Sequence, residues 1–210
     1  MNTMAYEKLD YSLALLGATA DGKRQGCIIN SLHQATSSYP AKFTVTLSKS
    51  HETTKAVEAA GSFSVTLLDA GCPDGIINDF GYKSGRVGDK FASYDAKADD
   101  AGNPYLTEHM ISRISCKVVD KLDLGNYVLY VGQVTEAEVL GEGAVLTLNA
   151  FTERGKPTPT TASVYRTVEI NGYRCPLCGY VYEGENPPPA DWRCPICNEK
   201  GSEFTKIETN

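Results

Sequence analysis

Four cysteines in two close pairs near the end of the chain constrain its fold more than any other feature. Cys175 and Cys178 form the first pair and Cys194 and Cys197 the second, in the pattern C-x2-C-x15-C-x2-C. Two intervening residues let one tight loop aim both sulfurs at a single point. Two such loops build a tetrahedral four-sulfur site, which suits zinc or iron. The spacing therefore predicts a metal centre.

The segment that holds these pairs is short, and this strengthens the prediction. Residues 172–210 are close to the ~40-residue size below which a chain needs a staple in order to fold, and metal binding supplies folding free energy. A disulfide framework is the weaker alternative. The chain has seven cysteines, an odd number, and it begins without the basic start and cleavage site of a signal peptide. We expect the scattered Cys27, Cys72 and Cys116 to be small core or loop residues.

Aromatic residues crowd the same segment and bear on the choice of metal. They could form an apolar jacket that controls water access and tunes the potential of a redox metal, which favours iron. A simpler interpretation is that a very small domain needs large side chains for its core. Spacing alone favours zinc, because zinc ribbons are common. The residues concerned are Tyr173, Tyr180, Tyr182, Trp192 and Phe204.

The amino-acid sequence of this segment resembles that of a rubredoxin. The phrase "YRCPLCGYVYEGE" and the later "PPPADWRCPICNEKGSEFTKIE" carry the resemblance, with Phe204 downstream. The resemblance implies one iron ion held by Cys175, Cys178, Cys194 and Cys197. Such an iron cycles between Fe(III) and Fe(II) and passes one electron at a time. The insert between the pairs is shortened, as in the rubredoxin-like modules of fused proteins.

The rest of the chain reads as a globular β-rich domain. Hydrophobic residues make up 41% of the 210 residues, and the formal net charge of −6 argues against nucleic acid as a partner. No apolar run approaches the ~18 residues of a membrane span. We therefore expect a cytoplasmic protein with no membrane partner.

A period of two in hydrophobicity predicts several strands. Residues 43–47, 62–67, 113–118, 127–134 and 144–148 read as strands, and together they predict a closed or nearly closed antiparallel barrel. A helix is expected over 51–60, with Ser50 as its N-cap and Gly61 as its stop. Residues 154–161, "RGKPTPTT", read as an exposed connector. We expect a first domain over 1–165, a linker over 166–171 and the cysteine module over 172–210.

A one-electron centre needs a donor, and three stretches suit a flavin. In 26–40 a strand runs into short polar side chains that could bond the edge of a flat ring, although an ordinary Ser/Thr-rich loop reads the same way. In 47–57 a strand end and a helix start offer hydroxyls and Lys49 to a phosphate, although a capped surface helix is the simpler interpretation. There, His51 is interpreted as solvated. In 79–91 glycines and the cations Lys83, Arg86 and Lys90 suit a ligand.

Taken in order, these stretches resemble the flavin reductase-like family of FMN-binding split barrels over roughly 5–165. The phrases are "GCIINSLHQATSSYP", "SKSHETT" before "SFSVTLL", "FGYKSGRVGDKF" and "YVGQV", and "RGKPTPTTASVY" resembles the end of that domain in flavin reductase–rubredoxin fusions. The resemblance implies FMN near a homodimer interface and hydride donation by NADH or NADPH. The candidate FMN-binding residues are Asn30, Ser31, Ser48, Lys49, Ser50, Thr53, Ser84, Arg86 and Lys90.

Two positions depart from the family pattern. Many members carry a histidine just before the "YVG" strand, where this chain has Asn126 or Tyr127, so that histidine's role in nicotinamide binding is not carried over. The usual "SGRD" reads "SGRV" at 84–87. No G-x-G-x-x-G opens a βαβ unit, so a nicotinamide would have to stack on the flavin in an open cleft.

The sequence therefore predicts a two-domain electron-transfer oxidoreductase. NAD(P)H gives a hydride to FMN, and electrons then pass singly through the iron to a partner. The resemblance implies that this partner is a flavodiiron protein that reduces dioxygen or nitric oxide. The alternatives are a free-flavin or ferric reductase, and an FMN-binding barrel that carries a structural zinc ribbon.

Overall fold

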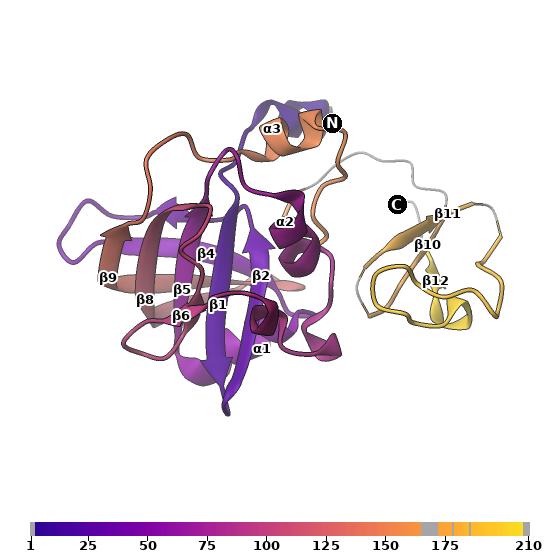
Figure 1. Ribbon diagram of the computed structural model, residues 1–210, viewed down its shortest axis with the longest axis horizontal. Coiled ribbons are helices and arrows are strands. Elements are labelled where there is room, and N and C mark those ends of the chain that lie inside the picture. The colour runs from indigo at the N-terminus through magenta and orange to yellow at the C-terminus, as the bar shows by residue number, and fades with distance from the viewer. Residues whose placement is uncertain (1–2, 165–171, 178, 185, 208–210) are drawn as a thin grey trace.

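The computed structural model describes residues 3–164, 172–177, 179–184 and 186–207, which form a β-rich body and a small C-terminal module (Figure 1). The body contains a seven-stranded antiparallel sheet in the order β2-β1-β5-β8-β9-β4-β3. Its strands are β1 (Ala14–Ala20), β2 (Lys23–Ile29), β3 (His33–Gln34), β4 (Lys42–Ser48), β5 (Ser62–Leu68), β8 (Met110–Asp123) and β9 (Tyr127–Val139). A separate two-stranded sheet pairs β6 (Lys97–Ala98) with β7 (Pro104–Tyr105).

The large sheet curls into a barrel. Cys27 of β2 and Val45 of β4, from opposite parts of the strand order, belong to one buried cluster with residues of β1, β5, β8 and β9. A flat sheet could not bring them together. Ser31, just after β2, bridges to β4: its Oγ donates to the Thr46 carbonyl at 2.9 Å and accepts from the Thr46 N–H at 3.0 Å. The predicted mainly β split barrel is confirmed.

Most of the expected strands are present, and one is wrong. The strands predicted over 43–47, 62–67, 113–118 and 127–134 lie within β4, β5, β8 and β9. Residues 144–148 make only isolated bridges, and α3 (Leu148–Glu153) begins at Leu148. Leu146 accepts from the Leu13 N–H at 2.8 Å and donates to the Leu68 carbonyl at 2.8 Å. The segment therefore spreads its hydrogen bonds over two neighbours and forms no regular ladder.

Helices cover the barrel. α1 (Glu52–Ala60) buries Ala56 and Val57 in the barrel cluster and ends, as predicted, at Gly61, whose φ of 63° is left-handed. The predicted N-cap is wrong: the cap is His51, and the Ser50 hydroxyl bonds the Ser48 hydroxyl at 2.9 Å. A second core lies outside the barrel, where α2 (Asp74–Gly81), α3 and the 3-10 helix η3 (Lys90–Ser93) pack on β1 and β2. The other 3-10 helices are η1 (Thr3–Lys8), η2 (Gly85–Val87) and η4 (Gly201–Glu203).

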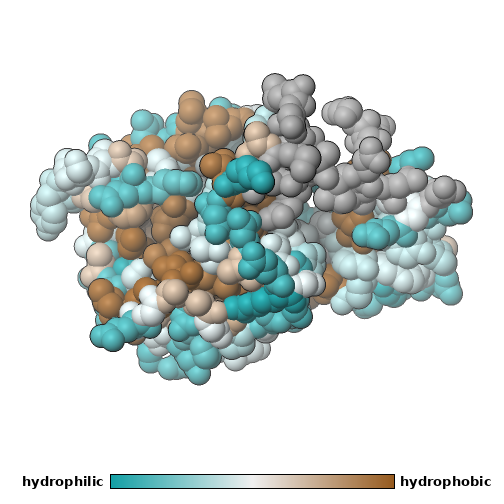
Figure 2. All heavy atoms as spheres, turned by 90° about the horizontal axis from the view of Figure 1, so that it is seen from above, coloured by the Kyte–Doolittle hydropathy of each residue, from teal (hydrophilic) through white to brown (hydrophobic). Residues whose placement is uncertain are grey.

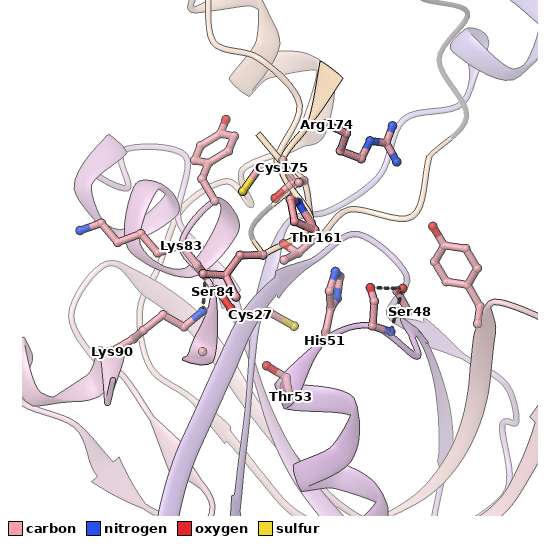
Figure 3. Close-up of a pocket in the computed structure, with 18 of the residues that line it drawn as sticks. Cys27, Ser48, His51, Thr53, Lys83, Ser84, Lys90, Thr161, Arg174 and Cys175 are labelled. Atoms are coloured by element: carbon pink, nitrogen blue, oxygen red, sulfur yellow. Dashed lines mark hydrogen bonds between the residues drawn. The ribbon is translucent and has the colours of Figure 1, made fainter. Parts of the chain in front are cut away.

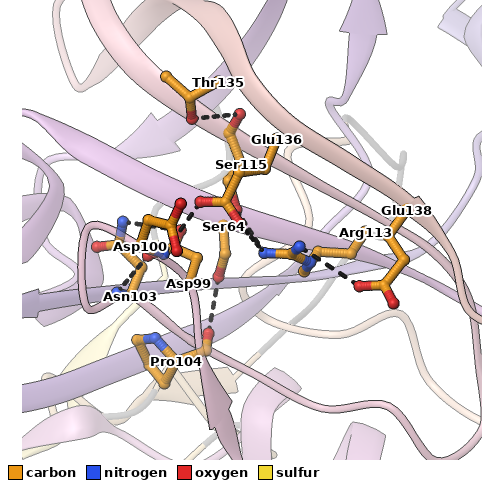
Figure 4. Close-up of polar contacts among 10 residues, drawn as sticks. All are labelled: Ser64, Asp99, Asp100, Asn103, Pro104, Arg113, Ser115, Thr135, Glu136 and Glu138. Atoms are coloured by element: carbon orange, nitrogen blue, oxygen red, sulfur yellow. Dashed lines mark hydrogen bonds and ion pairs between the residues drawn. The ribbon is translucent and has the colours of Figure 1, made fainter.

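A buried ion pair fastens the β6–β7 loop to the barrel wall (Figure 4). Arg113 of β8 is 8% exposed and donates to Glu136 of β9 at 2.7 Å. The Tyr105 ring lies 4.5 Å from the Arg113 guanidinium, and Glu136 also accepts from the Asp100 N–H at 3.0 Å. Ser64 donates to the Pro104 carbonyl at 2.7 Å. The loop is therefore held by charge, ring and hydroxyl contacts together.

The C-terminal module is a three-stranded sheet in the order β11-β10-β12, built from β10 (Gly172–Arg174), β11 (Val181–Glu183) and β12 (Thr205–Lys206). Trp192 is at its centre, with Tyr182 and Phe204 edge-on at 5.0 and 5.4 Å. The aromatic residues thus form the core beside the cysteines. The predicted linker over 166–171 lies outside the described residues, and the domain limits 1–165 and 172–210 stay predictions.

The surface mixes hydrophobic and polar residues. Figure 2 shows hydrophobic side chains gathered on the barrel, whereas the module presents a mostly polar face in that view. Large hydrophobic side chains stay exposed near the turn between β8 and β9, among them Leu122, Leu124 and Tyr127. In the described part of the chain, no helix has the length and hydrophobicity needed to span a membrane.

Candidate functional site

The cysteine sulfurs of the module converge. Those of Cys175, Cys194 and Cys197 all lie within 4.8 Å of one another, and those of Cys175 and Cys197 are 3.5 Å apart. Tetrahedral bonds of about 2.3 Å to a metal would set sulfur–sulfur separations of about 3.8 Å. The described sulfurs therefore fit a four-sulfur iron or zinc site. The remaining predicted ligand, Cys178, lies outside the described residues.

Two loops of matching geometry place these sulfurs. The Cys175 N–H donates to the Tyr180 carbonyl at 2.8 Å, and the Cys194 N–H donates to the Glu199 carbonyl at 2.8 Å. The Cys175 carbonyl accepts from Gly179, and the Cys194 carbonyl accepts from Asn198, each four residues on. Gly179 (φ 80°) and Asn198 (φ 62°) are both left-handed. The backbone around Cys175 and the backbone around Cys194 thus form the same kind of turn, which is why the spacing predicts the site so well.

A cavity of about 310 Å³ lies between the barrel and the module (Figure 3). The barrel contributes the turn before α1, the first turn of α1, and the segment from α2 to η3. The module contributes the stretch from Arg174 to Leu177, including the candidate metal ligand Cys175. The described residues that line the cavity include the cations Lys83, Lys90 and Arg174. They include no carboxylate. The cavity therefore suits an anionic ligand.

Many of the predicted FMN-binding residues meet at this cavity. Ser48, Ser50 and Thr53 line it beside α1, and Ser84 and Lys90 line it from the opposite wall. Sequence reasoning joined these two segments only through the family resemblance, whereas the fold brings them together. That these residues bind FMN stays a prediction.

The other candidates do not line the cavity. Lys49 pairs with Asp123 at 2.7 Å, and Arg86 pairs with Glu52 at 2.9 Å. The buried Asn30 accepts from the Ser163 N–H at 2.7 Å, and Ser31 makes the bridge between β2 and β4 described above. Their contacts are with the protein itself, and their role in binding FMN also stays a prediction.

Lys90 is the most notable charge in the cavity. Burial lowers the pKa of its ammonium to about 8. Its Nζ donates to the Lys83 carbonyl at 3.1 Å and lies 5.4 Å from the centre of the Phe80 ring. No ion pair with a carboxylate satisfies it within the described residues. Cys27 lies on the same wall, and burial raises the pKa of its thiol, so this sulfur is neutral.

His51 also lines the cavity, and sequence reasoning missed it. Its side chain is half-buried and not solvated, contrary to the interpretation above. Burial, followed by the charge of Lys90, lowers the pKa of the imidazole. The buried Nδ1 has no hydrogen-bond partner among the described atoms. No local pattern signals this placement, because it depends on how η3 and the module pack around the start of α1.

Two family models match the chain, one over the barrel and one over the module. Residues 6–154 match the family model described as "Flavin reductase like domain". The chain belongs to the flavin reductase-like family. Residues 173–205 match the model described as "Rubrerythrin, rubredoxin-like domain". The predicted fusion of a flavin reductase-like domain with a rubredoxin-like domain is confirmed.

Relatives support both halves. The chain is 30% identical to the high molecular weight rubredoxin of Moorella thermoacetica, over 99% of this chain and 100% of the relative. It is 35% identical to the ferric-chelate reductase (NAD(P)H) of Archaeoglobus fulgidus, over 79% of this chain and 98% of the relative. The structure of flavoredoxin from Methanosarcina acetivorans superposes with a TM-score of 0.57 at 24% identity, covering 62% of this chain and 69% of that one, which shows the shared fold. These findings agree with the predicted cofactors: a flavin, a metal in the cysteine cluster, and NAD(P)H.

Proposed function

We propose that this flavin reductase-like protein is an NAD(P)H-dependent electron-transfer oxidoreductase, with FMN in the cavity and one iron ion in the cysteine cluster. Bound FMN would take a hydride and release its electrons singly, which a one-electron iron requires. The observation that carries the proposal is the composition of the cavity wall. Cys175, a candidate metal ligand, lines the same cavity as the hydroxyls and cation that suit FMN.

The residues of the chain would hold and orient these groups. The Ser48 and Ser50 hydroxyls and Thr53 offer hydrogen bonds to a phosphate, and Lys90 supplies a positive charge without a direct ion pair among the described residues. The module closes one side of the cavity with Cys175 and Leu177, which would place the cysteine cluster beside a bound flavin. Hydride transfer needs no protein acid or base, so binding and positioning are the chain's contribution.

We further propose a flavodiiron protein as the electron acceptor, a homodimer as the assembly and the cytoplasm as the location. A one-electron iron centre suits a protein acceptor, and the exposed Leu122, Leu124 and Tyr127 offer apolar surface for a second copy. A ferric or free-flavin reductase is the second candidate, and it is favoured by the similarity to the ferric-chelate reductase of Archaeoglobus fulgidus.

The first test is the visible spectrum of the purified protein during anaerobic NADH titration. The proposal predicts ferric–thiolate bands superposed on a flavin spectrum, and both sets of bands should bleach as NADH is added. The Cys194→Ser variant is the matched control, because it should lose the iron bands and keep the reducible flavin. Iron bands that persist after the flavin is fully reduced would refute the relay, and zinc in iron-reconstituted protein would favour a structural ribbon.

A second measurement separates the acceptors. Both the full chain and Cys194→Ser are assayed with a flavodiiron protein and with a ferric chelate. An electron relay predicts that the variant loses transfer to the flavodiiron protein and keeps ferric-chelate reduction. Equal rates of the two proteins with both acceptors would favour the reductase candidate.

A further inference from the structure

Residues 154–163 form a strap that is anchored to the barrel, although the sequence predicts an exposed connector over most of them. The strap follows α3 and passes beside α2 (Figure 1). Near its beginning, Lys156 pairs with Asp74 of α2 at 2.9 Å. At its end, the Ser163 N–H donates to the side-chain oxygen of the buried Asn30 at 2.7 Å. Both ends of the strap are therefore fixed to the barrel.

The middle of the strap packs on the end of α2. Pro159 is buried, and a Cβ on Gly81 would lie 3.0 Å from the Pro159 Cβ. The Gly81 carbonyl accepts from the Thr160 hydroxyl at 2.9 Å. The next residue, Tyr82, donates its hydroxyl hydrogen to the Pro157 carbonyl. Because neighbouring residues of the strap are held by the end of α2, the position of the Thr160 side chain is fixed.

The strap meets the module at one of the two turns that hold the cysteines. Gly179 faces the Thr160 side chain: a Cβ on Gly179 would lie 3.5 Å from the Thr160 Cβ and 3.7 Å from its Cγ2. The Gly179 N–H donates to the Cys175 carbonyl at 3.0 Å. All three residues line the cavity between the barrel and the module. A chain of contacts therefore runs from the end of α2 through Thr160 to a candidate metal ligand.

We infer that Thr160 is a positioning residue, which docks the module so that the turn of Cys175 lies against the cavity. The inference rests on the proposed function, in which electrons pass from a flavin in this cavity to an iron in the cysteine cluster. A rate that depends on holding two groups in place falls sharply when one of them is displaced. The anchored strap would therefore set the rate at which the iron is reduced.

A bulky side chain at position 160 tests the contact with the module. The space between Thr160 and Gly179 has no room for an indole, so Thr160→Trp should displace the module. Thr135→Trp is the matched control, because Thr135 is also an exposed threonine whose hydroxyl donates to a backbone carbonyl, at 3.1 Å, and it is not among the described residues that line the cavity. Thr160→Ser keeps the hydroxyl and should behave as the unmodified chain.

Two measurements on the full chain, loaded with FMN and iron, report docking and electron transfer separately. Small-angle X-ray scattering gives the largest dimension of the oxidised protein, which should increase in Thr160→Trp alone. Anaerobic stopped-flow mixing with NADH gives the rates at which the flavin and the iron bands bleach. The ratio of the iron rate to the flavin rate should fall about tenfold or more in Thr160→Trp. Thermal melts and flavin content check that the barrel of each variant is intact.

Other results would overturn the inference. Thr160→Trp with an unchanged largest dimension would mean that Thr160 does not dock the module, and a larger dimension with an unchanged rate ratio would mean that docking does not govern electron transfer. An equal effect of Thr135→Trp would point to a general disturbance of the barrel. If the iron of the unmodified chain never bleaches, the proposed relay fails, whereas the scattering still shows whether Thr160 holds the module. The two failures therefore give different results.

Discussion

Binding of FMN should become weaker as the pH rises through 8, because of Lys90. Burial lowers the pKa of this ammonium from 10.5 to about 8 in the ligand-free protein. A phosphate dianion beside Lys90 favours the charged form and raises the pKa back toward its ordinary value. Between these two values the complex holds more protons than the free protein. FMN affinity must then fall as the pH rises in this window.

The size of the effect follows from the two pKa values. At pH 8 about half of the free Lys90 is neutral, so binding should take up about 0.5 proton. At pH 9 only about a tenth is charged, so the dissociation constant should be about tenfold higher than at pH 7. Cys27 should not contribute, because burial raises the pKa of its thiol.

Isothermal titration calorimetry measures both quantities. FMN is titrated at pH 7, 8 and 9 in two buffers of different ionisation enthalpy, which gives affinity and proton uptake together. Lys90→Met keeps the length of the side chain, and its affinity should be weaker but independent of pH. Riboflavin, which lacks the phosphate, should take up little or no proton. A constant FMN affinity from pH 7 to 9, without proton uptake, would refute the placement of the phosphate beside Lys90.

Three further changes test the fold around the site. Arg113→Met leaves the half-buried Glu136 without its ion-pair partner and should cost about 2–3 kcal/mol in urea unfolding, and a double variant that also carries Glu136→Leu should recover part of this loss. Gly132→Ala would put a Cβ 2.6 Å from Cys116 Cβ and should lower the free energy of unfolding by about 1–3 kcal/mol, with no loss in a melt arguing that the barrel can expand there. Cys194→Ser should make the module sensitive to trypsin while the barrel resists it, and a module that stays resistant would show that metal is not needed for its fold.

The sequence predicted those features that depend on neighbours along the chain. Strand positions followed from a period of two, since one face of each strand packs into the barrel. The metal cluster followed from C-x2-C spacing, because the loops around Cys175 and Cys194 repeat one pattern of backbone hydrogen bonds. Gly61 was recognised as the end of α1 because its left-handed conformation suits glycine.

Features that depend on distant partners were not predictable in this way. Lys49 belongs to the turn before α1, yet it pairs with Asp123, 74 residues further on. Residues 144–148 have the alternation of a strand, but Leu146 divides its hydrogen bonds between two neighbouring segments. His51 reads as a surface residue until η3 and the module are placed around it. In each case the tertiary contact decides.

The shared wall of the cavity links two equilibria. Because Arg174 to Leu177 of the module complete a cavity that otherwise belongs to the barrel, occupancy of the cavity and docking of the module must depend on each other. By reciprocity, a ligand that contacts both walls tightens docking by the factor by which docking tightens the ligand. A ligand too large for the closed cavity must displace the module by the same rule. The position of the module, and with it the position of the cysteine cluster, therefore depends on what the cavity holds.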